Sequence, residues 1–329
     1  MASPLNMGFI LSALLIIFTE RLPAMPTQNS SIRIYVLILF LLVAGLTGCT
    51  AIRPVVLDHP PAVDEPVFSH DYLDRVVGKY VDDDGMVDYQ ALQSDPQELE
   101  RYYSLLTRYS PDSHPALFPS ENHKLAYWIN GYNAAVLKTV LVYYPIDSVL
   151  DVKTPLVFAI LSDKAGFFFF QRITFGEKTT SLYYLENSVI RKRFDEPRIH
   201  FALNCASLGC PRLPKVAFRA ESLDEQLEYE TRRFLTEERN FRIDHAAKAI
   251  YLSMIFEWFE DDFTDWYSKR FPGHPANLLS YIELYLPAEK AAELHRVKSE
   301  YAVRFTPYDW RLNDQPVSSS AHRSALLER

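Results

Sequence analysis

Residues 120–144 read SENHKLAYWINGYNAAVLKTVLVYY, and this stretch decides the fold of the chain. Ser120 is a typical residue to cap the start of a helix, and Pro145 ends the pattern because proline cannot continue a helix. Between them, apolar residues fall on nearly the whole circumference of a helix with 3.6 residues per turn. A helix that is apolar all round is buried. The sequence therefore predicts one long central helix inside a hydrophobic core.

Two asparagines interrupt the apolar surface of this helix. Asn130 and Asn133 lie about one turn apart and share one side of it. A buried amide without hydrogen-bond partners costs about 1–3 kcal/mol, so both side chains need polar neighbours. The pair predicts a polar network, which either ties the helix to neighbouring loops or belongs to a binding site together with Trp128.

A second stretch, residues 200–211 (HFALNCASLGCP), combines apolar alternation with chemically active side chains. Phe201 and Leu203 alternate with small or polar neighbours, in the period of two that is typical of a strand. Gly209 and the proline after the second cysteine then force a turn. The predicted strand end carries four side chains capable of chemistry: His200, Asn204, Cys205 and Ser207.

The remaining segments predict a mixed architecture. Residues 68–315 form one domain, because no second linker interrupts them and 48% of the chain is hydrophobic, and residues 316–329 form a flexible tail. A strand is predicted at 167–175, and a helix at 181–193 carries Glu186 beside its apolar stripe. Residues 241–243 and 249–252 predict a hairpin. Strands and helices do not follow the βαβ order of a parallel sheet. The expected fold class is α+β, a single domain whose central helix packs on a mainly antiparallel sheet.

The first part of the chain has the pattern of an export signal. Arg33 precedes an apolar run, residues 34–46, that is too short to span a membrane comfortably. The sequence LTGC at 46–49 resembles a bacterial lipobox. Residues 1–48 therefore predict a signal peptide, with Cys49 as the lipidated first residue of the mature protein. The alternatives are an ordinary cleaved signal and an uncleaved anchor.

Flanking residues refine this prediction. Another apolar run lies upstream, so Met25 is the predicted true start of the signal. Residues 49–67 are rich in proline and predict an extended tether after the lipid. Thr50 follows the cysteine, as is typical of lipoproteins sent to the outer membrane. We therefore expect a lipid-anchored protein at the bacterial outer membrane, facing the periplasm.

Charge and cysteine count limit the partners and cofactors. Removing residues 1–48 changes the net charge from −8 to −9, because that segment carries −1 + 2 = +1. An acidic domain lacks the basic surface that binds nucleic acid. Attachment to the membrane is therefore expected to depend on the lipid alone. Cys205 and Cys210 remain in an oxidising compartment, either free or as a disulfide. With His200 they lack the usual ligand spacing of a metal site, so neither a metal nor another cofactor is predicted.

Five segments, in chain order, carry a family resemblance: Ala126–Ala134, Ser181–Glu186, Arg198–Pro211, Leu252–Trp258 and Tyr308–Asn313. They are similar to the bacterial and plant domain-of-unknown-function family 547 (DUF547). The resemblance covers most of residues 68–315 and implies a lipoprotein-type bacterial member, since bacterial members are often exported or lipid-anchored. The family has no agreed activity, so the resemblance implies a domain without implying its function.

The first candidate function is a cysteine-dependent hydrolase or acyltransferase, in a fold similar to papain-like or transglutaminase-like enzymes. Cys205 would attack, and His200, Asn204 and Glu186 would assist. A strand separates Cys205 from His200 by about 16 Å, with the side chains on opposite faces, so His123 is the substitute base. Papain-like enzymes also carry their cysteine at the start of the central helix, which this chain does not.

The second candidate is a binding module without catalysis. Trp128, Asn130, Asn133 and Ser207 would line an apolar pocket with a few orienting polar groups. A peptide, a glycan or a small amphiphile of the periplasm would fit such a pocket. A third interpretation is a scaffold, in which a disulfide between Cys205 and Cys210 staples the turn. The residues alone leave these alternatives open.

Overall fold

The computed structural model describes residues 50–55, 57, 61–63, 66–153 and 165–316. The predicted signal peptide, Cys49 and the tail from residue 317 lie outside the described residues. Within these ranges, no helix combines the length and the apolar character that a membrane span requires.

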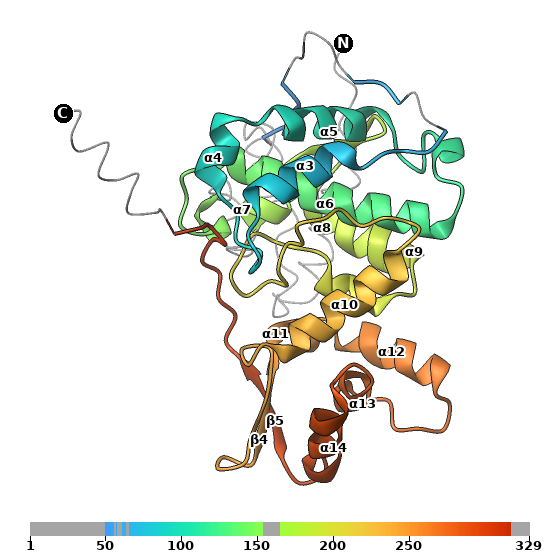
Figure 1. Cartoon of the computed structure of the whole chain (residues 1–329), viewed down its shortest axis with the longest axis vertical. Coiled ribbons are helices and arrows are strands. Elements are labelled where there is room, and N and C mark those ends of the chain that lie inside the picture. Colours follow the sequence, from blue (N-terminus) through green and yellow to red (C-terminus); the bar gives the residue numbers. More distant parts are fainter. Residues whose placement is uncertain (1–49, 56, 58–60, 64–65, 154–164, 317–329) are drawn as a thin grey trace, which may run out of the picture. The chain divides into compact units, whose positions relative to one another are not determined.

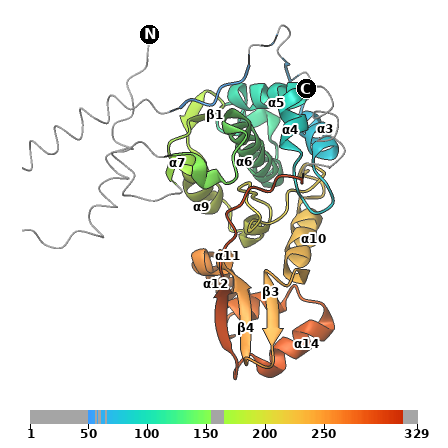
Figure 2. The same cartoon turned by 90° about the vertical axis from the view of Figure 1, so that its left-hand side faces the viewer.

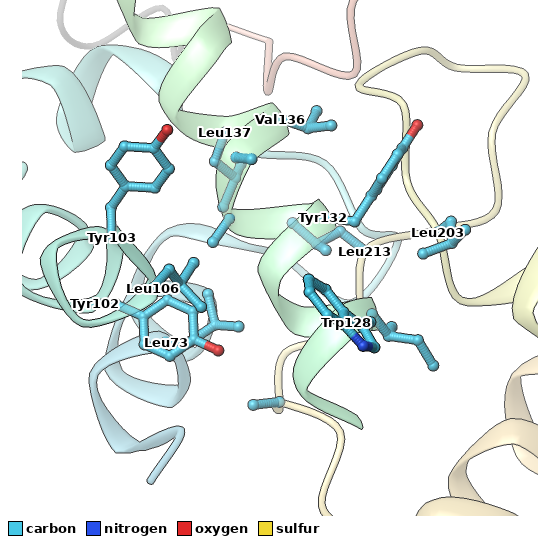
Figure 3. Close-up of a cluster of buried hydrophobic side chains, with 14 of the residues drawn as sticks. Leu73, Tyr102, Tyr103, Leu106, Trp128, Tyr132, Val136, Leu137, Leu203 and Leu213 are labelled. Atoms are coloured by element: carbon cyan, nitrogen blue, oxygen red, sulfur yellow. The ribbon is translucent and has the colours of Figure 1, made fainter. Parts of the chain in front are cut away.

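The predicted central helix is confirmed as α6, Glu121–Tyr143. Ser120 caps it, and its side chain accepts a hydrogen bond from the backbone N–H of His123. Every residue from Leu125 to Val140 is buried, as expected for a helix that is apolar all round. Figure 3 shows Trp128 and Tyr132 of this helix within the first hydrophobic core.

Helices are the main neighbours of α6, and the sheets of the domain are small rather than one large sheet under this helix. Its neighbours are α4, α5, α8 and the π-helix η4. Figures 1 and 2 show α3, α4 and α5 grouped beside it. Phe175, from a two-stranded sheet, also packs against α6, with its ring 5.7 Å from that of Trp128. The bounds of this group are α3 Asp71–Tyr80, α4 Tyr89–Ser94, α5 Gln97–Arg108, α8 Leu182–Tyr184 and η4 Leu185–Ile190.

A second hydrophobic core lies between the C-terminal helices and a three-stranded sheet. The predicted hairpin is confirmed as the antiparallel pair β3 and β4, but β5 pairs with β4 in parallel. A two-stranded antiparallel sheet, β1 with β2, lies in the first half of the domain. The fold is therefore α+β and mostly helical, with small sheets that are not all antiparallel. The bounds are β1 Ile173–Phe175, β2 Lys178–Thr180, α10 Leu223–Thr236, β3 Phe241–Asp244, β4 Ala249–Ser253, α11 Met254–Trp258, α12 Glu260–Arg270, α13 Leu278–Glu283, α14 Ala288–Val297 and β5 Ala302–Thr306.

The predicted strand at His200 is wrong. Residues Pro197–Phe201 form a 3₁₀ helix, η5, with proline at its first turn and Glu196 capping it. The run from Ile199 to Asn204 is buried throughout, so its apolar residues do not mark one face of a strand. Ile199 belongs to the first core and Phe201 to the second, which is why η5 needs apolar side chains in more than one direction.

The segment before η5 also differs in part from expectation. The predicted strand at 167–175 shortens to β1, because Ala165–Phe168 forms the short helix α7. The helix predicted at 181–193 is confirmed as α8, η4 and α9 (Arg191–Arg193) in succession. Its central part is a π-helix, a form that occurs frequently at functional sites.

Part of the predicted tether contacts the domain. The backbone N–H of Ile52 donates to the carbonyl oxygen of Arg172 at 2.7 Å, and the side chain of Ile52 is buried. The hydroxyl of Tyr103 donates to the Ile52 carbonyl oxygen at 3.1 Å. These contacts fix the chain against the domain soon after residue 49.

Candidate functional site

The two asparagines of α6 each hold one loop. The side-chain N–H of Asn133 donates to the carbonyl oxygen of Ala202, and its Oδ1 accepts from the backbone N–H of Asn204, both at 2.9 Å. Asn130 makes the same two-way contact with the backbone of Phe218, at 2.8 and 2.9 Å. Both amides are buried, and both ends of each are occupied. They act on the backbone of the loops that they position.

Replacing Asn133 with alanine should lower the free energy of unfolding by about 1–3 kcal/mol, because the Asn204 N–H and the Ala202 carbonyl would lose their partner in a buried place. Asn122→Ala is the matched control, since this exposed asparagine on the same helix makes one weak contact at 3.3 Å. Urea denaturation measures both variants. Equal stability of the two variants would show that the network does not hold the fold.

Residues 204–211 form a tightly fixed loop. Asn204 bonds both ends of the loop, accepting from the N–H of Ala206 at 2.9 Å and donating to the Pro211 carbonyl oxygen at 2.7 Å. The N–H groups of Leu208 and Gly209 donate to residues 311 and 309, each at 2.8 Å. A Cβ at Gly209 would lie 2.9 Å from the Asp309 nitrogen, so glycine permits this close approach.

A disulfide joins Cys205 and Cys210 across this loop. Cys205 is partly exposed, whereas Cys210 is buried, with 3% of its surface exposed. The hydroxyl of Tyr308 lies 3.1 Å from the sulfur of Cys205 and 3.0 Å from that of Cys210. The backbone N–H of Cys205 also donates to the Cys210 sulfur at 2.9 Å. In this state Cys205 has no thiolate, so its role as a hydrolase nucleophile stays a prediction for the reduced protein.

His200 is part of a separate polar cluster. Its Nε2–H donates to the carboxylate of Asp262 at 2.7 Å, and its ring stacks on Phe259 with centroids 4.0 Å apart. Arg191 binds the same carboxylate with two nitrogens, at 2.6 and 2.9 Å. Burial lowers the pKa of His200, although Asp262 opposes this. Burial alone would raise the pKa of Asp262, but the bonds from His200 and Arg191 hold that pKa below its ordinary value.

Glu186 lies on the π-helix η4 and is half-buried. Burial raises its pKa from 4.5 to about 7, although the Tyr132 hydroxyl, which donates to Oε2 at 3.2 Å, works against the rise. Burial also raises the pKa of Tyr308, and the negative charge of Glu186 adds to that rise. The charge of Glu186 therefore affects the pKa of Tyr308, the tyrosine beside the disulfide.

A cavity of about 640 Å³ lies beside the disulfide loop. Its walls come from the turn after α3, the loop 204–211, the end of α10 and the segment 306–313. Ser207, Cys210 and Tyr308 line it, and so do four arginines. The volume is in the range typical of small-ligand sites.

The structure brings only some of the predicted site residues together. Asn204, Cys205 and Ser207 share one loop, and Asn133 supports it. His200 bonds to Asp262, and Trp128 is buried with the guanidinium of Arg193 over its ring. His123, the substitute base, bonds Ser120 at 2.7 Å. These three side chains therefore have partners other than the sulfurs.

Sequence reasoning missed four residues that shape this region: Arg233, Asp262, Thr306 and Tyr308. Tyr308 lies in the segment 308–313, whose only signal in the sequence is its similarity to the DUF547 family. It reaches a sulfur 103 residues away along the chain, a distance that no local pattern encodes. The other three lie in ordinary helix and strand patterns and give no signal in the sequence.

Residues 117–235 match the family described as "Protein of unknown function, DUF547". The chain therefore carries a DUF547 domain at these residues, which include α6, η4, η5 and the disulfide loop. No curated protein and no solved structure matches the chain. The papain-like or transglutaminase-like likeness and the lipoprotein type stay predictions.

Proposed function

We propose that the DUF547 domain at residues 117–235 and the segment 306–313 together form a binding module for a small ligand with a carboxylate group, such as a peptide. What supports this is a set of hydrogen-bonding atoms without partners in residues around one cavity. The lipid anchor and periplasmic location predicted from residues 46–49 belong to the same proposal, and peptides with free carboxylates fit that location.

Three buried atoms define the chemistry of the ligand. Within the described residues, Ser207 Oγ, Arg233 Nε and Thr306 Oγ1 have no hydrogen-bond partner, and all three residues line the cavity. Each of these atoms can donate a hydrogen bond, and the arginine nitrogen can only donate. An ionised carboxylate only accepts, at about four lone-pair sites. A carboxylate therefore complements this set better than a neutral group that must also donate, once small side-chain rotations turn the donors toward it.

The charges around the cavity agree with an acidic ligand. Four arginines and three acidic residues line it, a balance of 4 − 3 = +1 in a chain of net charge −8. Arg212 and Arg311 are each bound by a carboxylate through two nitrogens. Arg239 is paired with Glu237 at 2.7 Å. Arg233 donates to the backbone carbonyl oxygen of Asp83 at 3.2 Å, and within the described residues the carboxylate paired with it is that of Asp84, which lies 3.6 Å away on a side chain that is 87% exposed. Arg233 is therefore the cation to which a ligand carboxylate can bind.

The test compares N-acetyl-alanyl-alanine with its C-terminal amide, which differ only in the carboxylate. The acid should raise the melting temperature of the protein, and the amide should not, because binding to the folded state stabilises it. Arg233→Gln should weaken binding of the acid by about 10-fold or more, since it removes a charged hydrogen bond. Calorimetric titration measures the affinity.

Arg304→Gln is the matched control, because Arg304 lies exposed on β5 and contacts Tyr251 outside the cavity. Its affinity for the acid should equal that of the unaltered protein. Equal responses to acid and amide would contradict the proposal. An equal loss in both arginine variants would show that general charge, rather than this cavity, binds the peptide.

A further inference from the structure

We infer a second activity, which does not depend on ligand binding in the cavity: the Cys205–Cys210 disulfide undergoes thiol–disulfide exchange, with Cys205 as the sulfur that an external thiolate attacks. The inference rests on the unequal surroundings of the two sulfurs and on the way the loop is held.

The two cysteines differ in access. Cys205 is partly exposed, whereas 3% of the surface of Cys210 is exposed. Although Cys210 lines the cavity, Cys205 is the more exposed residue of the two, so we take its sulfur as the one that an external thiolate attacks. Accessibility is one of the factors that decides which sulfur of a disulfide is attacked.

Hydrogen-bond donors surround the sulfur that would leave. The Cys205 N–H lies 2.9 Å and the Tyr308 hydroxyl 3.0 Å from the sulfur of Cys210. The guanidinium of Arg239 binds the carbonyl oxygen of Cys210 at 3.2 Å and adds a positive charge nearby. Burial keeps Tyr308 protonated, so its hydroxyl can donate to a thiolate. A stabilised leaving thiolate departs faster.

The step balances without another reagent. The external thiolate forms a bond to the sulfur of Cys205, the bond between the two protein sulfurs breaks, and its electron pair stays on Cys210 as a thiolate. A second thiolate can then attack the external sulfur of the mixed disulfide and release Cys205. The protein disulfide has then been reduced to a dithiol, and two external thiols have been oxidised to one disulfide.

Several hydrogen bonds hold the loop besides the disulfide. Hydrogen bonds from Ala206 to Asn204, from Cys210 to Ser207, and from residues 208 and 209 to 311 and 309 hold it independently. The disulfide also closes a loop of sequence separation 5, and short loops contribute the least chain entropy to stability. The bond can therefore open and close while the sulfurs stay close together.

The experiment treats the full chain with reduced glutathione, quenches with acid and locates the mixed disulfide by peptide mass spectrometry. We expect it on Cys205. Tyr308→Phe should slow exchange by about 10-fold, because the leaving thiolate loses a donor. Tyr301→Phe is the matched control, since that hydroxyl bonds His245 and not a sulfur. It should react at the rate of the unaltered protein.

Each other outcome decides against the inference. Glutathione attached mainly to Cys210 would contradict Cys205 as the attacked sulfur, and a disulfide that opens only in denaturant would show a structural staple. Equal exchange rates for Tyr308→Phe and Tyr301→Phe would show that the Tyr308 hydroxyl does not assist the leaving thiolate. Circular dichroism checks that Tyr308→Phe is folded; if it is not, the site of the mixed disulfide in the unaltered protein decides alone. These readouts differ from the peptide affinities, so either proposal can fail without the other.

Discussion

Replacing Lys138 with methionine is expected to lower the free energy of unfolding by about 3–5 kcal/mol, the largest stability effect that we predict. Lys138 lies in the centre of α6, and its ammonium group contacts Oε1 of Glu100 on α5. Their side chains are only 8% and 5% exposed. Methionine fills similar space but leaves the Glu100 carboxylate buried without its counter-charge. Urea denaturation measures the loss.

Two further variants test the cause of this loss. The double variant Glu100→Gln with Lys138→Met removes both charges and should recover most of the lost stability. The Val55 N–H donates to Oε2 of Glu100 at 2.9 Å, and the glutamine side chain can still accept this hydrogen bond. Lys290→Met breaks an exposed pair with Glu293 and should change stability by less than about 1 kcal/mol. A single Lys138→Met variant as stable as the unaltered protein would contradict the prediction.

Glu186→Gln is expected to stabilise the protein at pH 8 by up to about 3 kcal/mol and to have little effect at pH 4. The folded-state pKa of Glu186 is raised from 4.5 to about 7. The folded protein therefore holds this proton more tightly than the unfolded chain, and the stability that the proton provides is lost as pH rises from 4.5 through 7. Glutamine never ionises, so it does not incur this loss.

The measurement is the difference between variant and unaltered protein at each pH. This difference is needed because other groups titrate in the opposite direction. Burial lowers the pKa of His70 from 6.5 to about 3, so stability is lost there as pH falls below 6.5. Glu257→Gln, an exposed carboxyl on α11, is the control and should show no such trend. A Glu186→Gln variant that is less stable at pH 8 would mean that the charged carboxylate supports the fold.

The central helix shows what could be predicted. Its buried length and its start at Ser120 follow from apolar residues and a capping side chain that act within a few positions of one another. The paired asparagines likewise predicted a polar network, and the structure gives each a loop to hold. The partners of those amides lie 69 to 88 residues away, so the sequence could indicate the need for partners but not their identity.

The stretch at His200 shows why local patterns failed. Phe201 and Leu203 suggested one buried face, but η5 lies where two cores meet and is buried on several sides. Tertiary burial overrode the local pattern. The expected distance between His200 and Cys205 rested on that strand and no longer applies. In this structure the Nε2 of His200 bonds to Asp262 and not to a sulfur.

The sequence by itself determined the elements whose signals are local: the buried helix α6, the helical segment around Glu186 and the β3–β4 hairpin. Only the tertiary structure decided what surrounds the sulfurs, because Tyr308 reaches them from 98 and 103 residues away. It also decided which side chains line the cavity. Contacts of this kind depend on how helices pack and which strand joins β4, and periodicity within one segment carries no information about either.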